Sequence, residues 1–540
     1  YIYDRSDDQT YASYINQTIS IKNLSAIFPL VFYGVAILVS LISMNRMVED
    51  DRGEIGTLKS LGFNNKEIIT KYLRFSFLAT IIGAILGTII GLTAIPYLIF
   101  IIYRLLFLLP NFHFGLNLSI SLTSIIIAII CICGATIITA YKVLKDKPAI
   151  LMRPKPPTSG KKILLEKIKP LWHIIKFSNK ITIRNIFRYK KRVFVTVFGI
   201  TGCTALMLCG FGIKDSIVDL TKMQYGQTFK YDGITYTNNL TNKDIFNTEE
   251  ITSYIEAEQI TGTLNESNIT MLIVPSKEEL PKIVNTVNKE NKKVSLKENE
   301  VLITDKLADI HNIKKGDTIT ILDGDKKIYK LKVSEIVKNY MGHYIYLDKN
   351  TLSKYKEYKP NLVYFNTTNK LNKKEQEKLS NKLLQNDKVM TVIHTETLME
   401  STRDMLKSLD KIIAVLIILA AALSFVVLYN LSNINITERK REIATLKVLG
   451  FFDNEVDNYI TKENLILTVI GIIFGLIFGH FLTYIVIGTV ELENTRFLRE
   501  ISILSCIYSS LISLVFTFIV NFVTHHSLKK INMIESLKSV

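Results

Sequence analysis

Residues that commonly carry chemistry are few in this 540-residue sequence, and none stands in a pattern that a reaction needs. Gly160-Lys161-Lys162 has the look of a phosphate-binding loop, but the upstream glycine and the Ser/Thr after the lysine are missing. His525 and His526 end an apolar run, where a metal site is possible and an interfacial pair is commoner. There is no His-Glu-x-x-His, no Gly-x-Ser-x-Gly and no carboxylate cluster. We therefore expect no catalytic residue, no metal site and no ATP binding by this chain alone.

The five cysteines all fall inside apolar runs: Cys131, Cys133, Cys203, Cys209 and Cys506. Cys131-x-Cys133 is spaced like a metal pair, but no histidine or further cysteine lies nearby, so small apolar packing is the better interpretation. The polar segment 214–411 has no cysteine, and we expect no disulfide framework there.

What remains is a segment that occurs twice. Residues 53–63 and 439–451 share the pattern E-I-x-T-L-K-x-L-G-F. The same register pairs Asn45 with Asn433 and Glu67 with Glu455. A match that holds over so many positions indicates an internal duplication.

Each copy predicts a short amphipathic helix. Apolar residues recur at i, i+3 and i+6, and a glycine follows where helices commonly stop. The stripes are Ile55, Leu58 and Leu61 before Gly62, and Ile443, Leu446 and Leu449 before Gly450, the latter beside Arg439, Lys440 and Glu442. Such a helix at the membrane surface suits docking into a partner's groove. The alternative is a helix on the inner leaflet with no partner, which explains the stripe but not two nearly identical copies.

Two glycine ladders follow the copies in the same register: Gly83, Gly87 and Gly91, and Gly471, Gly475 and Gly479. Glycines four residues apart lie on one helix face and let helix backbones approach closely. We expect close packing between the two halves here, with a sliding surface as the alternative.

Seven apolar runs are long enough to cross a bilayer, which takes about 20 residues. They cover residues 27–44, 73–95, 118–140, 193–213, 412–431, 465–487 and 501–523. The spans are nearly free of ionisable residues, which argues against an ion-driven carrier. The sequence predicts a polytopic α-helical membrane protein with two pseudo-symmetric units.

The basic residues behind the formal net charge of +17 are concentrated in one stretch of the sequence. Residues 141–192 carry sixteen lysines and arginines against only Asp146 and Glu166. Such an excess beside spans marks the cytosolic side, so we do not expect nucleic acid as a partner. Counting spans from there places residues 214–411 outside and both copies of the repeated segment in the cytosol.

These elements divide the chain into six parts. By analogy with the second half, residues 1–26 are expected to end a first external domain that is missing together with its preceding span. Residues 27–142 form the first transmembrane unit, 143–192 a basic cytosolic linker, 193–213 a further span, 214–411 an extracytoplasmic α+β domain, and 412–540 the second transmembrane unit. In the external part, residues 318–333 predict a hairpin around Asp323-Gly324, and residues 276–289, 373–385 and 396–409 predict helices, the last running into the fifth span.

The two copies at 54–62 and 442–450 resemble the FtsX-like permease family, the membrane subunits of type VII (MacB/LolCDE-like) ABC systems. Residues 183–192, 301–308 and 315–318 support the resemblance. In that family the repeated segment is the coupling helix that meets the ATPase. The resemblance therefore implies coupling roles for Glu54, Ile55, Leu58, Lys59, Leu61, Gly62, Arg439, Glu442, Ile443, Leu446, Lys447, Leu449 and Gly450. It also implies a separate ATPase in two copies, which holds the ATP and Mg²⁺, and no cofactor in this chain.

The expected function is an ABC permease in a bacterial cell membrane that exports or extracts a hydrophobic or amphiphilic substrate such as a lipid, peptide or drug. Two alternatives stay open. One is a mechanotransmission complex that regulates an external cell-wall hydrolase, and the other is a module for antimicrobial-peptide sensing or resistance. A protein bound to the external domain would favour the first alternative.

Overall fold

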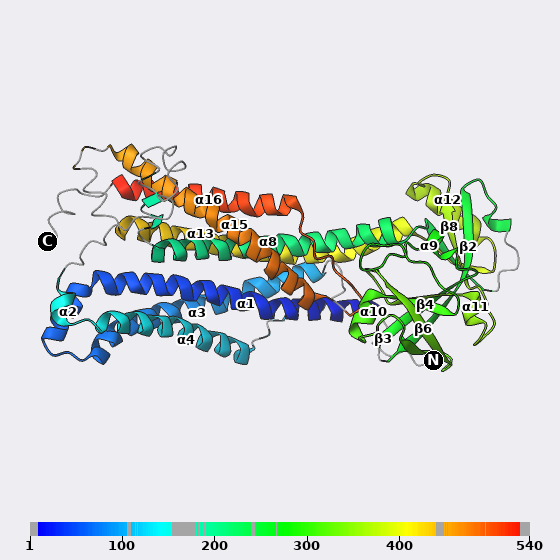
Figure 1. Cartoon of the computed structure of the whole chain (residues 1–540), viewed down its shortest axis with the longest axis horizontal. Coiled ribbons are helices and arrows are strands. Elements are labelled where there is room, and N and C mark those ends of the chain that lie inside the picture. Colours follow the sequence, from blue (N-terminus) through cyan, green and yellow to red (C-terminus); the bar gives the residue numbers. More distant parts are fainter. Residues whose placement is uncertain are drawn as a thin grey trace. The chain divides into compact units, whose positions relative to one another are not determined.

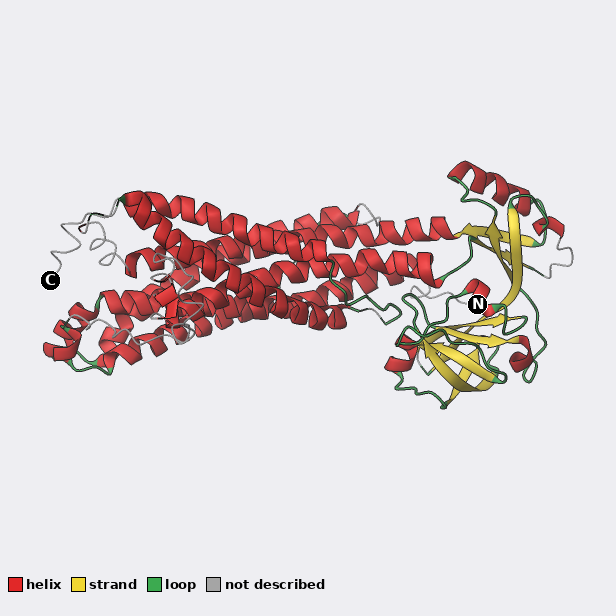
Figure 2. Cartoon of the chain, turned by 45° about the horizontal axis from the view of Figure 1, so that its top comes forward, coloured by secondary structure: helices red, strands yellow, loops and turns green. Residues whose placement is uncertain are grey.

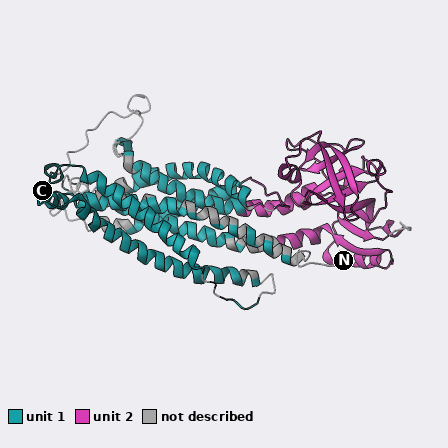
Figure 3. Ribbon diagram, turned by 90° about the horizontal axis from the view of Figure 1, so that it is seen from below, with its two compact units in different colours: residues 1–213, 410–489, 501–540 teal, residues 214–409, 490–500 magenta. Residues whose placement is uncertain are grey.

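The computed structural model of the chain describes residues 9–104, 110–113, 115, 117–153, 180, 183–184, 186–187, 190–238, 244–265, 267–438, 448, 450, 452–491 and 493–529. It divides into two compact units, coloured separately in Figure 3. Unit 1 comprises residues 1–213, 410–489 and 501–540. Unit 2 comprises residues 214–409 and 490–500.

Long helices form unit 1 (Figure 1). They are α1 (Gln9–Asp50), α3 (Asn65–Arg104), α4 (Leu118–Leu144), α8 (Lys190–Met223), α13 (Thr395–Glu438), α15 (Asp453–Val490) and α16 (Ile503–Lys529), with the short α2 (Arg52–Ser60) and α5 (Pro148–Leu151) between them. Each of the seven long helices contains a stretch long and apolar enough to cross a membrane. The seven predicted spans are confirmed, and helices satisfy their own backbone polar groups as lipid requires.

Each half of unit 1 has its own core. In the first half, α1, α3 and α4 enclose residues such as Val48, Tyr72 and Leu144. In the second half, Ile200 of α8 packs with Leu428, Ile472 and Val520, which lie on α13, α15 and α16.

The two halves meet along α1, α8 and α13. Val35 of α1 packs against Cys203 of α8 and Val427 of α13. Nearby, the Asn430 Nδ2 donates to the Ser43 Oγ at 3.1 Å. A side-chain hydrogen bond between helices stabilises their association in lipid by about 1 kcal/mol, so the halves are joined by shape and by polar contact.

Unit 2 contains all the strands that the structure describes (Figure 2). They are β1 (Gly233–Thr237), β2 (Ile251–Leu264), β3 (Ser267–Val274), β4 (Glu300–Thr304), β5 (Thr318–Asp323), β6 (Ile328–Val337), β7 (Tyr344–Asp348), β8 (Leu362–Thr367) and β9 (Val389–His394). Short helices α9 (Leu280–Ile283), α10 (Asp305–Ile310) and α11 (Lys349–Leu352) and the longer α12 (Lys373–Leu384) connect them.

The long strand β2 belongs to two sheets. Its last residues pair with both β3 and β5, which closes the ring β2-β3-β7-β4-β6-β5 into a barrel. Alternate residues of these strands point inward, so Met271, Ile303 and Ile321 share one core. The first residues of β2 instead pair with β8, and β1 and β9 extend that second sheet.

The predicted fold class, a polytopic helical membrane protein with an α+β domain, is confirmed. The hairpin around Asp323-Gly324 is present as β5 and β6, and α12 and α13 occupy the helical stretches expected at 373–385 and 396–409. The helix expected over 276–289 is wrong, because only Leu280–Ile283 is helical. Val284 and Val287 there form isolated bridges with other extended segments, a conformation that β-branched residues favour.

Candidate coupling sites

The first copy of the repeated segment folds as α2 followed by a tight turn into α3. Gly62 has a φ of +92°, where glycine is strongly favoured, and the Glu67 carboxylate accepts from the Asn64 backbone N–H at 2.9 Å. At the second copy Gly450 has a φ of +93°, and Glu455 accepts from the Phe452 backbone N–H at 3.0 Å. The duplication therefore extends to backbone conformation. Arg439, Glu442, Ile443, Leu446, Lys447 and Leu449 lie outside the described residues, and their role stays a prediction.

The predicted apolar stripe of α2 points mostly into the membrane unit. The Ile55 side chain is 1% exposed among α1, α3 and α4, and Leu58 is half-buried beside it. A Cβ on Gly56 would come within 2.9 Å of the Met152 Cγ and 3.1 Å of the Leu151 Cβ, so α5 lies directly against α2. Burial of Ile55 and the partial burial of Leu58 hold α2 in place, and the coupling role of both residues stays a prediction.

Polar contacts add to this anchor. The Lys59 ammonium donates to the carbonyl oxygens of Leu144 at 2.7 Å and Asp146 at 3.0 Å, at the end of α4. The Arg52 guanidinium pairs with the Asp146 carboxylate at 3.0 Å. A cation at a helix C-terminus satisfies free carbonyls and opposes the helix dipole. Glu54 instead lies exposed and pairs with Lys71 at 2.7 Å.

The apolar side chains that α2 and its turn present to solvent are the last residue of the stripe and one residue beyond it. Leu61 is 71% exposed and Phe63 is 49% exposed, on either side of Gly62. At the second copy Phe452 is 76% exposed and Val448 is 59% exposed. Each copy thus carries exposed apolar side chains around its left-handed glycine.

The glycine ladder of α15 packs against α8, which belongs to the same half. Cβ atoms on Gly471, Gly475 and Gly479 would lie 2.7, 2.6 and 2.9 Å from the nearest atoms of Ile200, Thr204 and Leu208. A Cβ on Gly83, Gly87 or Gly91 of α3 would meet nothing within 4 Å. The predicted packing of the two ladders between the halves is wrong, because the halves meet along α1, α8 and α13 instead.

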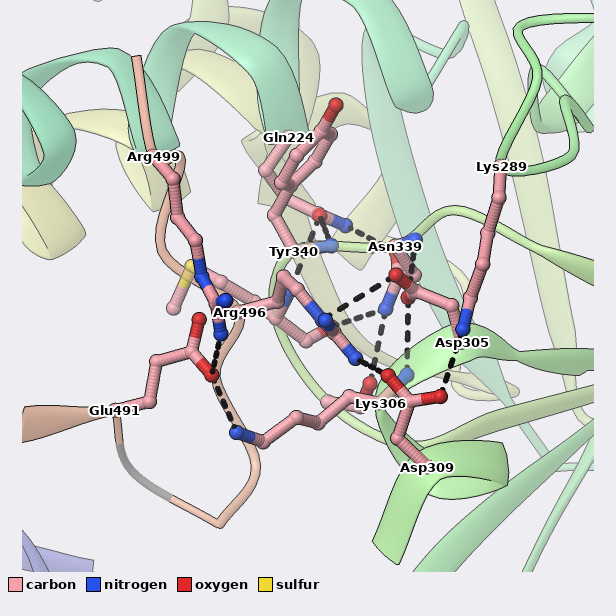
Figure 4. A network of polar contacts seen from close by, with 12 residues as sticks. Gln224, Lys289, Asp305, Lys306, Asp309, Asn339, Tyr340, Glu491, Arg496 and Arg499 are labelled. Carbon is pink, nitrogen blue, oxygen red and sulfur yellow. Dashed lines mark hydrogen bonds and ion pairs between the residues drawn. The ribbon is translucent and has the colours of Figure 1, made fainter. Parts of the chain in front are cut away.

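In unit 2, residues 490–500 are held against the barrel by a network that we call the clasp (Figure 4). The Gly342 N–H donates to the Asn494 carbonyl at 2.8 Å, and the Arg496 N–H donates to the Tyr340 carbonyl at 2.9 Å. The Ser267 hydroxyl donates to the Glu493 carboxylate at 2.8 Å. Segment 490–500 therefore pairs with the loop between β6 and β7, through an isolated β-bridge between Met341 and Thr495.

Ion pairs with three residues of α10 also hold the clasp. The Arg496 guanidinium pairs with Asp305 at 3.3 Å and with Asp309. Lys306 pairs with the almost fully buried Glu491 at 2.9 Å. Burial raises the pKa of Asp305, although the charge of Arg496 opposes this. Because the pairs are largely removed from water, losing one partner would leave a buried charge unbalanced.

A buried glutamine and histidine complete the clasp. The Gln224 side chain donates to Asn339 at 3.0 Å and accepts from the Tyr340 N–H at 3.0 Å, which holds the segment that pairs with Asn494 and Arg496. His343 is buried, and among the described residues neither of its ring nitrogens has a hydrogen-bond partner of good geometry. Desolvation lowers the pKa of His343.

Two segments of the chain match the model of the FtsX-like permease C-terminal domain, residues 26–148 and 414–533. Each contains one copy of the repeated segment. Each half of the chain therefore carries an FtsX-like permease domain.

Two solved structures were also found as similar. The periplasmic region of MacB from Actinobacillus actinomycetemcomitans is 11% identical, covers 32% of this chain and 94% of its own, and has a TM-score of 0.22. The extracellular domain of the noncanonic ABC-type transporter YknZ from Gram-positive bacteria is 13% identical, covers 30% and 98%, and has a TM-score of 0.21. Both TM-scores are low. No curated protein matches the chain.

The family predicted from the repeated segment is therefore confirmed, in a duplicated form. As an FtsX-like permease the chain is a multi-pass membrane subunit of an ABC transporter, and the family implies a partner ATPase. Sequence reasoning missed Phe63 and Phe452 as exposed side chains, although Phe63 ends the motif in the first copy and Phe452 directly follows it in the second. It also missed the clasp. The sequence signal for the clasp is the group of charged residues in 490–500, among them Glu491, Arg496 and Arg499, between two apolar runs.

Replacing Lys59 by Met should loosen α2. The carbonyls of Leu144 and Asp146 would lose their cationic donor, which costs about 2 kcal/mol of local stability. Hydrogen exchange of residues 54–60 should speed up in Lys59→Met and stay unchanged in the control Lys66→Met, whose side chain is exposed. Equal exchange in Lys59→Met and wild type would contradict the anchoring role.

Replacing Arg496 by Met should open the clasp, because Asp305 would stay buried without its cation, at a cost of about 3 kcal/mol. Hydrogen exchange of residues 490–500 is the measurement. The control is Lys277→Met, which removes an exposed pair with Glu298 and should change exchange there little. Unchanged protection in Arg496→Met would show that the backbone pairing alone holds the segment.

Mild acid should also loosen the clasp. His343 has a lowered pKa when closed, so an open state binds its proton more readily, and His343 stabilises closure above about pH 6.5 but loses that contribution as the pH falls. Glu493, His311 and Lys306 face it, and the raised pKa of Asp305 acts in the opposite direction. Exchange of 490–500, corrected for intrinsic rates, should rise between about pH 7.5 and 5.5. The rise should shrink in His343→Phe but persist in His113→Phe.

Proposed function

We propose that this chain is the membrane subunit of a bacterial ABC exporter that moves or extracts a hydrophobic or amphiphilic substrate. ATP and Mg²⁺ bind two copies of a separate ATPase, one beneath each repeated segment. The chain itself contributes docking surfaces and moving helices. Residues 214–411 lie on the outer side of the membrane, which follows if the basic residues 141–192 lie in the cytosol.

The observation that carries this proposal is the pair of exposed apolar side chains, Leu61 and Phe63, beside the left-handed Gly62. Large apolar side chains at the tip of a charged turn are costly in water and favour burial in a partner. The second copy also exposes apolar side chains near Gly450, at Val448 and Phe452, which stand at the positions of Ser60 and Asn64 in the first copy. An exposed apolar surface at each copy fits two ATPase subunits.

The anchor of α2 supports a mechanical role. Ile55 is enclosed by three long helices, and Lys59 is bonded to the end of α4. A push on Leu61 and Phe63 would therefore displace the cytosolic ends of the helices together, because α2 cannot bend away without losing buried contacts. Rigid elements transmit displacement in this way.

The clasp favours a second candidate, in which the motion itself is the output. Residues 490–500 are covalently continuous with α15 and α16, and their ion pairs tie them to α10 of the barrel. Movement of those two helices would thus pull on the external domain. An external enzyme bound to that domain, such as a cell-wall hydrolase, could be regulated by this motion without transport of any substrate.

The test is affinity purification of the chain from its native membrane, with the co-purified ATPase measured. Leu61→Asp combined with Phe452→Asp should reduce the ATPase about tenfold or more, since a charge replaces a buried apolar contact at each site. Ser60→Asp, which places the same charge on an exposed neighbour, should retain it.

Retention of the ATPase by the double variant would overturn the docking proposal. In the wild-type complex, stimulation of ATP hydrolysis by an amphiphile favours export. A stoichiometric external protein without such stimulation favours mechanotransmission.

A further inference from the structure

Thr196 of α8 is a buried threonine, 5% exposed, whose hydroxyl has no hydrogen-bond partner among the described residues. Buried polar groups are almost always paired with protein or with ordered water. Other buried threonines of the bundle donate to the carbonyl one turn earlier, as Thr468 does to Asn464 at 2.8 Å. Thr196 lacks this contact in the described part of the chain, so its hydroxyl has a hydrogen to donate to another group.

A small polar cavity lies beside Thr196, between α8, α13, α15 and α16. It leaves a volume of about 20 Å³ for a molecule of the size of water, which is enough for one water. Its polar lining consists of hydroxyl and amide side chains: Thr196, Ser432, Asn464, Thr468, Thr517 and Asn521. The other lining residues are apolar, and none of the described residues that line the cavity is charged. Space and hydrogen-bonding groups therefore occur together.

Two threonines of the lining offer acceptors. The hydroxyl oxygens of Thr468 on α15 and Thr517 on α16 lie 3.2 Å apart. Each also lies within hydrogen-bond distance of the backbone carbonyl one turn earlier on its own helix, at 2.8 and 2.9 Å. A hydroxyl has one hydrogen and two lone pairs, so two hydrogens serve these three contacts. In these contacts most of the lone pairs on the two oxygens remain available to accept a hydrogen.

We propose that this cavity binds one ordered water molecule. The water accepts the hydrogen of the Thr196 hydroxyl and donates its own hydrogens to the oxygens of Thr468 and Thr517. Three hydrogen bonds are the usual number for a buried water. The bound water thus links α8 to α15 and α16 within the second half of the membrane unit. The site does not depend on the export function proposed above, so either proposal can fail without the other.

A monovalent cation is the competing occupant, and the lining argues against it. Hydroxyl and amide oxygens can bind a cation, but its charge needs compensation once it leaves water. None of the described lining residues supplies a carboxylate. A cation also cannot accept the hydrogen that Thr196 has to donate, whereas a water molecule serves both the donor and the acceptors.

The link through water differs from the contact eight residues further along α8. There the hydroxyl oxygens of Thr204 and Ser513 lie 3.0 Å apart, so α8 meets α16 directly. A contact through water is nearly as favourable as a direct one, and the water can move and exchange partners when the helices shift. The site therefore allows the beginning of α8 to move against α15 and α16 while the Thr204 contact persists.

A structure of the whole chain in lipid nanodiscs, at a resolution that shows ordered water, tests the proposal. We expect isolated density about 2.8 Å from the Thr196 hydroxyl oxygen, within hydrogen-bond distance of Thr468 and Thr517 as well. Absence of this density would overturn the proposal. Density surrounded by several oxygens at about 2.4 Å, together with a thermal midpoint that depends on Na⁺ at constant ionic strength, would overturn it in favour of a cation.

Substitution of Thr196 gives a second readout. Thr196→Val keeps the shape and removes the hydroxyl, so the density should disappear and the thermal midpoint of the chain should fall by about 2 °C or more. Thr196→Ser should retain both. The matched control is Thr139→Val, because Thr139 is also 5% exposed but its hydroxyl donates to the Ala135 carbonyl at 2.9 Å. This control should leave the density at Thr196 unchanged. A midpoint that rises or stays constant in Thr196→Val would show that the hydroxyl binds no water.

Discussion

This membrane unit depends on close packing between its helices, because lipid supplies no hydrophobic force that drives helices together. Apolar side chains gain little by leaving lipid for protein, so shape and hydrogen bonds must hold the helices. Gly471, Gly475 and Gly479 provide the shape where α15 meets α8. Polar contacts add to it along the same bundle, as with Thr204 and Ser513, whose hydroxyls lie 3.0 Å apart.

Given that packing, α2 and the segment between α15 and α16 are each held by their own set of contacts. At the end that carries α2, Ile55 and Lys59 fix the helix while Leu61 and Phe63 stay exposed. The segment between α15 and α16 instead joins unit 2, where buried ion pairs on α10 hold it. A chain whose helices must move needs contacts that hold those helices rigidly more than it needs a pocket. Both sets of contacts do this.

The sequence predicts the repeat, the spans and the α+β class because each depends on local pattern. A run of apolar residues specifies a span, and Asp323-Gly324 specifies a hairpin, without knowledge of distant residues. Periodicity also revealed the stripe Ile55-Leu58-Leu61, but a stripe does not say whether it faces the protein or a partner. The structure buries its first residue and exposes its last.

For a related reason, the sequence could predict neither the clasp nor the different surroundings of the two glycine ladders. Arg496 meets Asp305 across almost two hundred residues of sequence, and no local pattern pairs them. The ladders are identical in spacing, so only their surroundings distinguish Gly475, packed on Thr204, from the open Gly87. Six of the thirteen candidate coupling residues lie outside the described part of the chain, and for them the sequence remains the only guide.

The measurement that tests the central claim most directly is the exchange protection of residues 490–500 in the complex with its ATPase, compared between nucleotide-free and ATP-bound states. If docking at Leu61 and Phe452 drives the helices, protection of this segment should differ between the two states. The difference should vanish in Leu61→Asp with Phe452→Asp and persist in Ser60→Asp. Identical protection in both nucleotide states of the wild-type complex would contradict the account.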